Sequence, residues 1–527
     1  MKQLWYGGKI YTMEKENETV EAVLVEDGKI IEIGSVAVLE SQADEKHNLN
    51  GAAMYPGFVD SHLHIISHGE KLSRLDLSNA TSLEEVLELI RQAAKHTPSD
   101  QWLFGEGWNE NNFPDTKIPT LEQLDSITNK PMILTRICHH QVLVNSRALE
   151  IAGITVTTED PDGGKIGKNM DGTLNGRLFE RAKDLVEAVI PKEGEVYIDY
   201  LTKTLNLAID DLLSKGLTGG HSEDMSYFGH YMNPLTAYKR VIGEKHHFRV
   251  NLLRHNFVFE QMMKDNIRYD EPFIEPGGMK LFADGALGGS TAALSTPYAD
   301  DLYNSGMLIH SNEELEFYVR IARDYHESVA IHAIGDAGAE QVIQTLEKYP
   351  VPEGKRDRLI HGCVLREDLV ERLKKLPIVI DIQPLFLPSD FPWVQERLGK
   401  ERLEWAYAWR KLLDRGIMCA NGTDSPIEDV DPIQTIYAAV ERKRPNDDHE
   451  GYLPDEKLSR FEAVQLYTLG SAKAICKENE RGLIKDGYDA DFSIFDKDLF
   501  EGTSEDMLKV KAIKTVVAGK IVYENNQ

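Results

Sequence analysis

Hydrophobic and polar residues alternate at both ends of the chain, and this alternation predicts short β-strands there. The N-terminal run EAVLVEDGKIIEIGS contains Asp27 and Gly28, a turn signal that joins two strands into a hairpin. The C-terminal runs RGLIKDGYDADFSIFD and IKTVVAGKIVYENN have the same β-rich character. We therefore predict a small β-sandwich domain that is assembled from residues 1–54 and 475–527.

The middle of the chain alternates between short apolar runs and helical patterns. In the stretch SNEELEFYVRIARDYH, for example, Leu315, Val319 and Ala322 recur at the spacing of one helical face. Eight alternating β/α units fit a closed (β/α)8 TIM barrel, an α/β fold, and a doubly wound open sheet is the alternative. The eight apolar runs that we interpret as strands are Met54–His64, Leu217–Ser222, Arg249–Arg254, Met279–Asp284, Val329–His332, Arg358–His361, Ile378–Gln383 and Ile417–Asp424.

Roughly 150 residues separate the first two of these strands, far more than one crossover connection needs. This stretch has its own helical pattern, TSLEEVLELIRQAAKH, with Thr81 or Ser82 as the expected N-cap, and its own strand-like runs, QWLFGEGW and PMILTR. We predict that residues 71–200 form an inserted subdomain and that 55–70 with 201–474 form the barrel. Because the insertion leaves directly after the first strand, we expect it to act as a lid that selects the substrate.

Charge and composition exclude several classes of function. The 527 residues carry a formal net charge of −28, which does not suit binding to nucleic acid or to an anionic membrane surface. The 4 cysteines are widely spaced, which favours a reducing, cytoplasmic compartment over a disulfide framework. No apolar run reaches the ~18–20 residues of a membrane span, and no secretory signal is visible. We expect a small-molecule substrate as the partner, with a homodimer as an open alternative to a monomer.

Residues with metal-binding chemistry stand where the expected strands end. His62 and His64 are two positions apart, so in a strand their side chains share one face, and converging imidazoles can begin a metal site. A partly buried strand end with hydrogen-bonded histidines is the alternative. Because the carboxyl ends of all barrel strands surround one mouth, residues of later strands are expected to join them there. These residues are Lys280, His332, His361 and Asp424.

Each of these later residues also has a structural explanation. His332 and His361 could be core histidines, and Asp424 could be a turn or N-cap residue. Lys280 could pair with Asp284 at the surface. The joint pattern favours the metal site, because each residue falls where a barrel enzyme carries its ligands.

Several ordered motifs resemble those of the amidohydrolase superfamily. They run from PGFVDSHLH through GEGWNE, HHQVLVNSRAL, KLFADGALGGSTAAL, IHAIGDAGAEQV, LIHGCVL and GTDSPI to RGLIKDGYDADFSIFD. The chain is similar over nearly its whole length to the YtcJ-like metal-dependent hydrolases of amidohydrolase family 3, a group related to N-substituted formamide deformylases. The resemblance implies a (β/α)8 barrel with a small β domain built from both termini.

The resemblance also implies how the site would work. His62, His64 and Asp424 would hold one divalent ion, His332 and His361 a second, and a carboxylated Lys280 would bridge the two. Subgroups of the superfamily differ in metal number, so one or two ions per chain are expected, and zinc suits these ligands best. Asp424, Lys280 and His361 are the expected catalytic residues. Asp424 would accept the proton of the attacking water and deliver it to the leaving nitrogen.

Residues outside this group are candidates for binding the substrate. In the insertion these are His140 and Asn145 in the family-like segment CHHQVLVNS, Trp108 together with Trp102 and Phe113, and Glu180. The alternative for His140 and Asn145 is local hydrogen bonding. For the three aromatic residues it is burial in the insertion's own core, and for Glu180 it is an exposed helix position.

Two more candidates come from the barrel strands. His221 ends the second expected strand and so should face the mouth. Asp336 follows His332 and is expected to orient a loop or a ligand histidine.

Together these features predict a metal-dependent hydrolase that cleaves a carbon–nitrogen bond of a small molecule through a metal-activated hydroxide. A non-peptide amide of the N-formyl or N-acyl type is the nearest substrate class that the resemblance implies. A heterocycle deaminase of the same superfamily is one alternative. A catalytically silent regulatory or scaffold protein is another, and the complete set of ligand-type residues argues against it.

Overall fold

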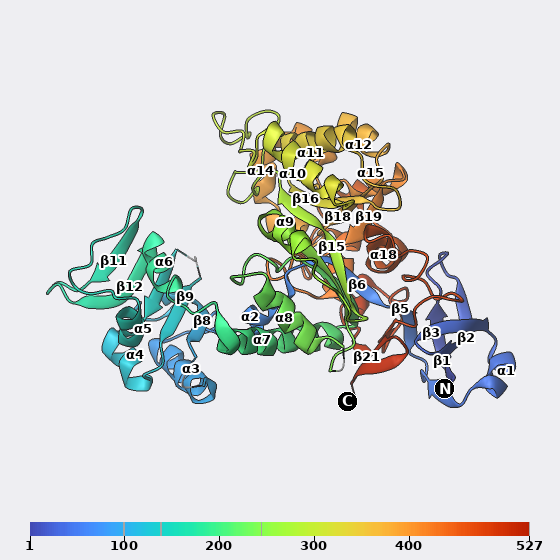
Figure 1. Ribbon diagram of the computed structural model, residues 1–527, viewed down its shortest axis with the longest axis horizontal. Coiled ribbons are helices and arrows are strands. Elements are labelled where there is room, and N and C mark those ends of the chain that lie inside the picture. The colour runs from blue at the N-terminus through green and yellow to red at the C-terminus, as the bar shows by residue number, and fades with distance from the viewer. Residues whose placement is uncertain (99–100, 138–139, 244, 526–527) are drawn as a thin grey trace. The chain divides into compact units, whose positions relative to one another are not determined.

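Eight parallel strands form the barrel in the computed structural model of the protein, which describes residues 1–98, 101–137, 140–243 and 245–525 (Figure 1). Each strand is hydrogen-bonded to the next in chain order. The first and last strands also meet, because Asp424 N donates to His62 O at 2.7 Å and His64 N donates to Ser425 O at 2.8 Å. The predicted (β/α)8 barrel is confirmed. Its strands are β6 (Phe58–Leu63), β13 (Leu217–Ser222), β14 (Arg249–His255), β15 (Ile274–Phe282), β16 (Val329–Ala333), β17 (Asp357–His361), β18 (Ile378–Ile382) and β19 (Met418–Asn421).

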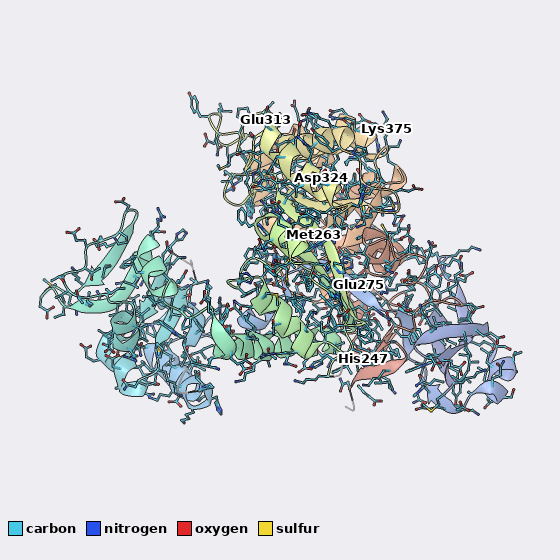
Figure 2. All side chains as sticks on the ribbon, in the orientation of Figure 1. His247, Met263, Glu275, Glu313, Asp324 and Lys375 are labelled. Atoms are coloured by element: carbon cyan, nitrogen blue, oxygen red, sulfur yellow. The ribbon has the colours of Figure 1, made fainter. Side chains whose placement is uncertain are left out.

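Helices connect the strands of the barrel. Helix α10 shows why the sequence forms them: Ser311 caps it in a reciprocal pair with Glu314, and Leu315, Val319 and Ala322 form its buried face, as predicted. The opposite face is exposed and carries Glu313, Arg320 and Asp324 together with Phe317, and Figure 2 labels Glu313 and Asp324. The helices of this part of the chain are α2 (Ile65–Ser73), α7 (Gly194–Ser214), α8 (Met232–Val241), α9 (Asn256–Lys264), α10 (Asn312–Asp324), α11 (Asp336–Lys348), α12 (Glu367–Leu373), α13 (Phe386–Asp390), α14 (Trp393–Arg402), α15 (Trp409–Asp414), α16 (Pro432–Glu441), α17 (Arg460–Gln465) and α18 (Ser471–Ala474).

The run that we expected to be one strand, Met54–His64, is two strands. β5 (Ala53–Pro56) belongs to the sheet of the termini, and β6 enters the barrel after a break at Gly57. A side chain at Gly57 would collide with Thr218, and the Gly57 amide donates to Asp491 O at 2.8 Å. The chain therefore changes sheets at the one residue of this run that has no side chain.

Strands from both termini form one sheet. Its order is β22-β21-β20-β5-β1-β2-β3, and β4 pairs with β1. Asp27 and Gly28, both with positive φ, make the predicted hairpin turn between β2 and β3. The sandwich arrangement of this sheet stays a prediction. The elements are β1 (Gln3–Tyr11), β2 (Thr19–Glu26), β3 (Lys29–Gly34), β4 (Glu45–Asn48), β20 (Phe492–Phe495), β21 (Ala512–Val517) and β22 (Lys520–Glu524), with the short helices α1 (Val36–Leu39) and α19 (Ser504–Met507).

The insertion is a separate compact unit, Glu70–Tyr197, while Met1–Gly69 and Ile198–Gln527 form the other unit. Ser82 caps the first long helix of the insertion by accepting from the Glu85 amide. The sheet order is β11-β12-β10-β9-β8-β7. The elements are β7 (Leu75–Asp76), α3 (Leu83–His96), β8 (Leu103–Trp108), α4 (Leu121–Ile127), β9 (Met132–Arg136), β10 (Gln141–Val144), α5 (Ser146–Ile151), β11 (Gly164–Lys168), β12 (Leu174–Glu180) and α6 (Asp184–Glu187).

Across the described residues, none of the helices combines the length and the apolar character that crossing a membrane requires.

Candidate metal centre

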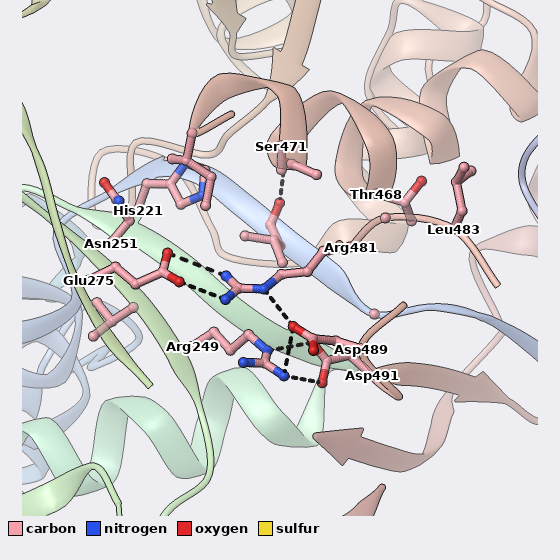
Figure 3. Close-up of a pocket in the computed structure, with 16 residues that line it drawn as sticks. His221, Arg249, Asn251, Glu275, Thr468, Ser471, Arg481, Leu483, Asp489 and Asp491 are labelled. Carbon is pink, nitrogen blue, oxygen red and sulfur yellow. Dashed lines mark hydrogen bonds and ion pairs between the residues drawn. The ribbon is translucent and has the colours of Figure 1, made fainter. Parts of the chain in front are cut away.

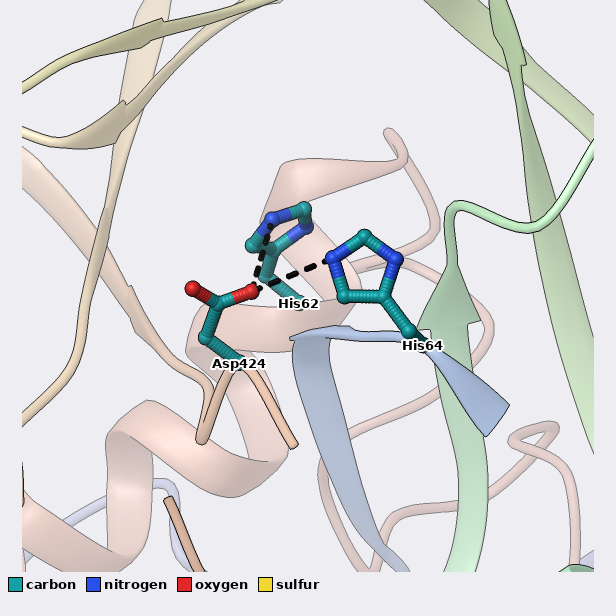
Figure 4. Close-up of side chains that lie close together, drawn as sticks. All are labelled: His62, His64 and Asp424. Carbon is teal, nitrogen blue, oxygen red and sulfur yellow. Dashed lines mark ion pairs between the residues drawn. The ribbon is translucent and has the colours of Figure 1, made fainter. Parts of the chain in front are cut away.

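Two histidines and an aspartate meet at the carboxyl end of the barrel (Figure 4). One potential ligand atom of each of His62, His64 and Asp424 lies within 4.8 Å of the others. Asp424 Oδ1 is 3.5 Å from His62 Nε2 and 3.3 Å from His64 Nε2. Ligand atoms that surround one zinc ion tetrahedrally at about 2.1 Å lie about 3.4 Å apart. The spacing of these three atoms therefore fits a single divalent ion.

The local backbone explains how these side chains meet. His62 is in β6 and His64 follows it, while Asp424 comes three residues after β19. Asp60 connects the two segments, because it accepts from the His62 amide and from the amide and hydroxyl of Thr423. Asp424 has φ of 57°, a left-handed conformation that is uncommon outside glycine. Such conformations persist where the surrounding hydrogen bonds hold them, and they cluster at functional sites.

A second group lies beside the first. Lys280 Nζ is 3.3 Å from His62 Nε2, and the ring of His361 is 5.8 Å from that of His62 and 4.5 Å from that of His332 between centroids. Lys280, His332 and His361 come from three consecutive strands, β15, β16 and β17. The structure thus brings together all six residues that the sequence assigned to the metal site, and Lys280 does not form the alternative surface pair with Asp284, because it is 1% exposed.

Hydrogen bonds to carbonyl oxygens orient three of the histidines. His64 Nδ1 donates to Glu223 O at 2.6 Å, His361 Nδ1 to Gln383 Oε1 at 2.8 Å and His332 Nε2 to Gly285 O at 3.0 Å. A carbonyl oxygen can only accept, so each bonded nitrogen carries the hydrogen. The other ring nitrogen therefore faces the site. At His332 and His361 it keeps its lone pair, as a metal ligand requires, whereas at His64 it faces Asp424.

Burial tunes the charges of the site. Burial lowers the pKa of His62 and of His332 well below the usual range, and a neighbouring side chain adds to the effect: Lys280 at His62 and His361 at His332. Burial also lowers the pKa of His361, to about 4. Burial also lowers the pKa of Lys280 to about 8, although the nearby Glu223 and Asp424 oppose it. Three neutral imidazoles and a lysine that gives up its proton easily are a donor set for a cation.

The His64–Asp424 pair behaves differently. Burial opposes a charge on either group, but their hydrogen bond outweighs it, raising the pKa of His64 to about 9 and lowering that of Asp424. Without a metal ion the pair is therefore an imidazolium and a carboxylate. A divalent ion would replace the proton between them, so metal binding releases a proton here.

His221 does not belong to this group. It is 2% exposed and borders a small cavity that is also lined by Arg249, Glu275 and Arg481 (Figure 3). Arg249 begins β14 and Glu275 lies at the start of β15, so this cavity is at the amino-terminal end of the barrel. The expectation that His221 faces the mouth is wrong, because its side chain lines this cavity, whereas Glu223, two residues later, contacts His64.

His140 and Glu180 meet on the surface of the insertion. His140 Nδ1 is 2.9 Å from Glu180 Oε2, and the two side chains are 70% and 58% exposed. Glu180 ends β12, and its φ of 48° turns the chain sharply there. The pair is accessible to a ligand, and its contact with the substrate stays a prediction.

Trp108 and Asn145 have structural roles. The Trp108 ring is 1% exposed, lies in the insertion's hydrophobic core with Phe113, and donates from Nε1 to Leu134 O at 3.1 Å. Trp102 packs at the edge of a neighbouring core cluster. Asn145 is fully buried and caps α5. A ring enclosed on all sides has no face for a ligand, so the location of Trp108 favours the packing alternative over substrate binding.

Asp336 orients a loop, as one of its two expected roles. Its carboxylate accepts from the amide of Ser295 at 2.9 Å and from the Ser295 hydroxyl.

Two residues that the sequence did not single out, Glu223 and Gln383, orient ligand histidines. Each directly follows a barrel strand, β13 or β18, so the strand-end rule that found the ligands would also have found them.

Comparison with known proteins gives three relevant matches. A model of the amidohydrolase family matches residues 46–523. The chain is 46% identical over 536 residues to "Putative amidohydrolase YtcJ" of Bacillus subtilis (strain 168), and the alignment covers 100% of both chains. It is 25% identical to the N-substituted formamide deformylase of Arthrobacter pascens, over 98% of this chain and 97% of that one.

Among solved structures, an uncharacterized metal-dependent hydrolase from Pyrococcus horikoshii OT3 is similar, with a TM-score of 0.80 and 28% identity. The match covers 96% of this chain and 99% of that chain.

Proposed function

The chain belongs to the amidohydrolase family of metal-dependent hydrolases, and from this premise we propose that it cleaves a non-peptide carbon–nitrogen bond of the N-formyl or N-acyl amide type in a small molecule. The observation that carries the proposal is the spacing of His62, His64 and Asp424, which fits one divalent ion. The amide type rests on the similarity to the N-substituted formamide deformylase. The metal that we propose is zinc, one or two ions per chain, because imidazole and carboxylate ligands suit it.

The residues of the chain have separate tasks in this reaction. A bound divalent ion would lower the pKa of water to about 7 and polarise the substrate carbonyl. Asp424 accepts the proton that water loses as its oxygen adds to the carbonyl carbon, and returns it to the nitrogen as the carbon–nitrogen bond breaks. The products are a carboxylic acid, or formate, and an amine. Glu223 and Gln383 hold His64 and His361 so that Nε2 of each ring faces the site, and at His64 a bound ion would replace the proton on Nε2.

We also propose that Lys280 is carboxylated. Its amine is buried next to His62, where an unpaired ammonium would be unfavourable, and burial lowers its pKa to about 8. The neutral amine adds to carbon dioxide and loses one proton, which yields an anionic carbamate. Native mass measurement or a crystal structure at full metal occupancy tests this. A bare amine there would contradict the carbamate and favour a single ion.

Metal analysis and a substrate screen together test the function. Protein purified without chelator should contain about one or two equivalents of a divalent metal, and N-formyl or N-acyl amines should be cleaved to formate or a carboxylate. Asp424→Asn should lose turnover, whereas His449→Ala, at an exposed histidine outside the six-residue group, should not. Ammonia from purines or pyrimidines would support the deaminase alternative, and less than half an equivalent of metal, not restored by added metal, would contradict both.

Substrate selection by the insertion is a further part of the proposal. Its support is the exposed His140–Glu180 pair, which offers a polar contact in a family-like segment. His140→Ala should raise KM with little effect on metal content. A matched control is Arg147→Ala, because Arg147 forms an exposed pair with Glu150 in the same unit.

A cytoplasmic, reducing location is proposed from the cysteines. Among the described residues, Cys363, Cys419 and Cys476 are free thiols. Cell fractionation tests the location, and native mass measurement separates a monomer from a homodimer.

A further inference from the structure

A third histidine of the opening motif, His68, forms two hydrogen bonds that the proposed reaction does not use. It lies in α2, one helical turn after His64, and is 5% exposed. Its Nε2 is 2.7 Å from Asp211 Oδ2 in α7, and its Nδ1 is 3.0 Å from Ser425 Oγ. Labels α2 and α7 mark these neighbouring helices in Figure 1. An aspartate, a histidine and a serine are thus connected in series.

The charges along this series define the direction of its hydrogen bonds. Burial raises the pKa of Asp211, but hydrogen bonds from His68 and Lys215 outweigh it and lower the pKa overall, so Asp211 is an anion. An anionic carboxylate only accepts, and His68 Nε2 therefore carries the hydrogen. In the neutral imidazole, Nδ1 then keeps its lone pair, and the hydroxyl of Ser425 donates to it at 3.0 Å.

Ser425 is connected to both ends of the candidate metal site. It follows Asp424 directly, and its carbonyl accepts from the His64 amide at 2.8 Å. Its own amide donates to Thr423 Oγ1 at 3.2 Å. Asp424, between these two anchored residues, has the left-handed φ of 57°. A rotation of Ser425 would therefore move the carboxylate of Asp424 and the start of the segment that carries His64.

The same three residue types occur in serine hydrolases, but Ser425 does not fit that chemistry. Its side chain is fully buried, so no substrate carbonyl can approach Oγ. Its hydroxyl faces His68, and the adjacent carboxylate of Asp424 faces the metal ligands. The series supports the residues of the metal site from behind.

We propose that Asp211, His68 and Ser425 form a positioning relay that holds Asp424 and His64 at the spacing a divalent ion needs. The relay rests on the proposed function, because it acts on the same ligands. Partners of metal ligands that lie outside the coordination shell typically change metal affinity or activity roughly 10–100-fold when removed. The relay should show an effect of that size although none of its residues contacts the metal.

The test measures zinc affinity by competition with a chelator, together with turnover of the zinc-loaded enzyme and thermal melting. Ser425→Ala removes the hydroxyl but keeps both backbone bonds, and zinc affinity should fall roughly 10–100-fold. His68→Leu should have a similar effect, and the double variant should be little worse than either single variant, because both changes break one relay. His246→Leu is the matched control, since His246 bonds to Asn206 in the same helix α7 but not to Ser425.

Two conservative variants separate positioning from packing. In the His68→Asn variant, the side-chain amide oxygen can take the place of Nδ1 and accept from the Ser425 hydroxyl. In the His68→Gln variant, the side-chain amide nitrogen takes the place of Nε2 and reaches toward Asp211 instead. The relay requires zinc affinity nearer to wild type in His68→Asn than in His68→Gln. The comparison of these two variants also applies if His68→Leu does not fold.

The relay is contradicted if Ser425→Ala binds zinc and turns over like the wild type, or if losses follow melting temperature alone. Its failure differs from failure of the proposed function. If the wild type binds zinc and Asp424→Asn is inactive while Ser425→Ala is normal, only the relay is wrong. If the wild type binds no zinc at all, the metal site itself is wrong.

Discussion

The two ends of the barrel use polar residues in opposite ways. At the amino-terminal end, charges neutralise one another: Arg481 is 2.6 Å from Glu275 and 2.9 Å from Asp489, and Arg249 is 2.5 Å from Asp491 (Figure 3). At the carboxyl end, His62, His64 and Asp424 direct their polar atoms to one place, and the imidazole of His62 is neutral there (Figure 4).

The contrast shows how one fold separates stability from chemistry. At the amino-terminal end of the barrel, which we call the base, paired charges hold the C-terminal segment against the start of β14 and β15. These pairs need no ligand. Donor atoms at the mouth satisfy one another only in part, and a cation would complete them. Variants at the base should therefore change stability, and variants at the mouth should change activity and metal binding.

The largest effect is expected at the mouth. Asp424→Asn removes the proposed proton acceptor and should lower turnover roughly 10²–10⁴-fold. His62→Ala should do the same by removing a metal ligand. Turnover and metal content are measured together, and near-normal turnover of Asp424→Asn with metal bound would remove Asp424 from its catalytic role.

Removing the metal ion should also lower the free energy of unfolding, because the ion binds to the mouth of the folded barrel. A ligand at a hundred times its dissociation constant stabilises the folded state by about 2.7 kcal/mol. Dialysis against a chelator should therefore abolish activity and lower the melting temperature, and zinc should restore both. A base variant such as Arg481→Met should keep the same metal-dependent shift. If that variant loses the shift, the two ends are not independent.

Breaking the base should cost stability without changing turnover per folded molecule. Arg481→Met leaves Glu275 and Asp489 without this partner, and we expect a loss of about 2–3 kcal/mol. This is less than for a fully buried pair because the Glu275 side chain is 26% exposed. Denaturant unfolding measures it. Arg372→Met, which breaks an exposed pair with Glu347, should cost less than about 1 kcal/mol.

The last expected effect is a pH dependence of stability that arises from Lys280 at the mouth. In the metal-free, uncarboxylated protein, burial lowers the pKa of Lys280 from 10.5 to about 8. Between these values the unfolded chain holds a proton that the folded chain lacks, so the free energy of unfolding should rise with pH in this window. Lys280→Met should remove that rise when unfolding is followed without bicarbonate. An unchanged pH profile would mean that Lys280 titrates normally.

Much of the fold follows from local patterns. The apolar runs predicted β13 with its observed bounds and most other barrel strands within a few residues. The spacing of Leu315, Val319 and Ala322 predicted α10, because helical periodicity acts over a few residues. The break at Gly57 was missed, since it depends on the approach of Thr218 from another strand.

The metal-site group was also predictable, because a barrel brings all strand ends to one mouth. That rule places backbones and not side chains, and His221 shows its limit. The role of Trp108 was equally open from the sequence, because an aromatic residue in an apolar run can line a pocket or fill a core. Only the packing of the insertion's sheet and helices decides between them.

By itself, the sequence determined the order of strands and helices and the residue types at the strand ends, because both depend on the chemistry of near neighbours. The tertiary structure alone decided which ring nitrogen of His64, His332 or His361 is free, since a carbonyl from another segment selects it. It alone joined Asp211, His68 and Ser425 as well. These contacts are side-chain hydrogen bonds between segments up to hundreds of residues apart, and their geometry exists only once the barrel closes.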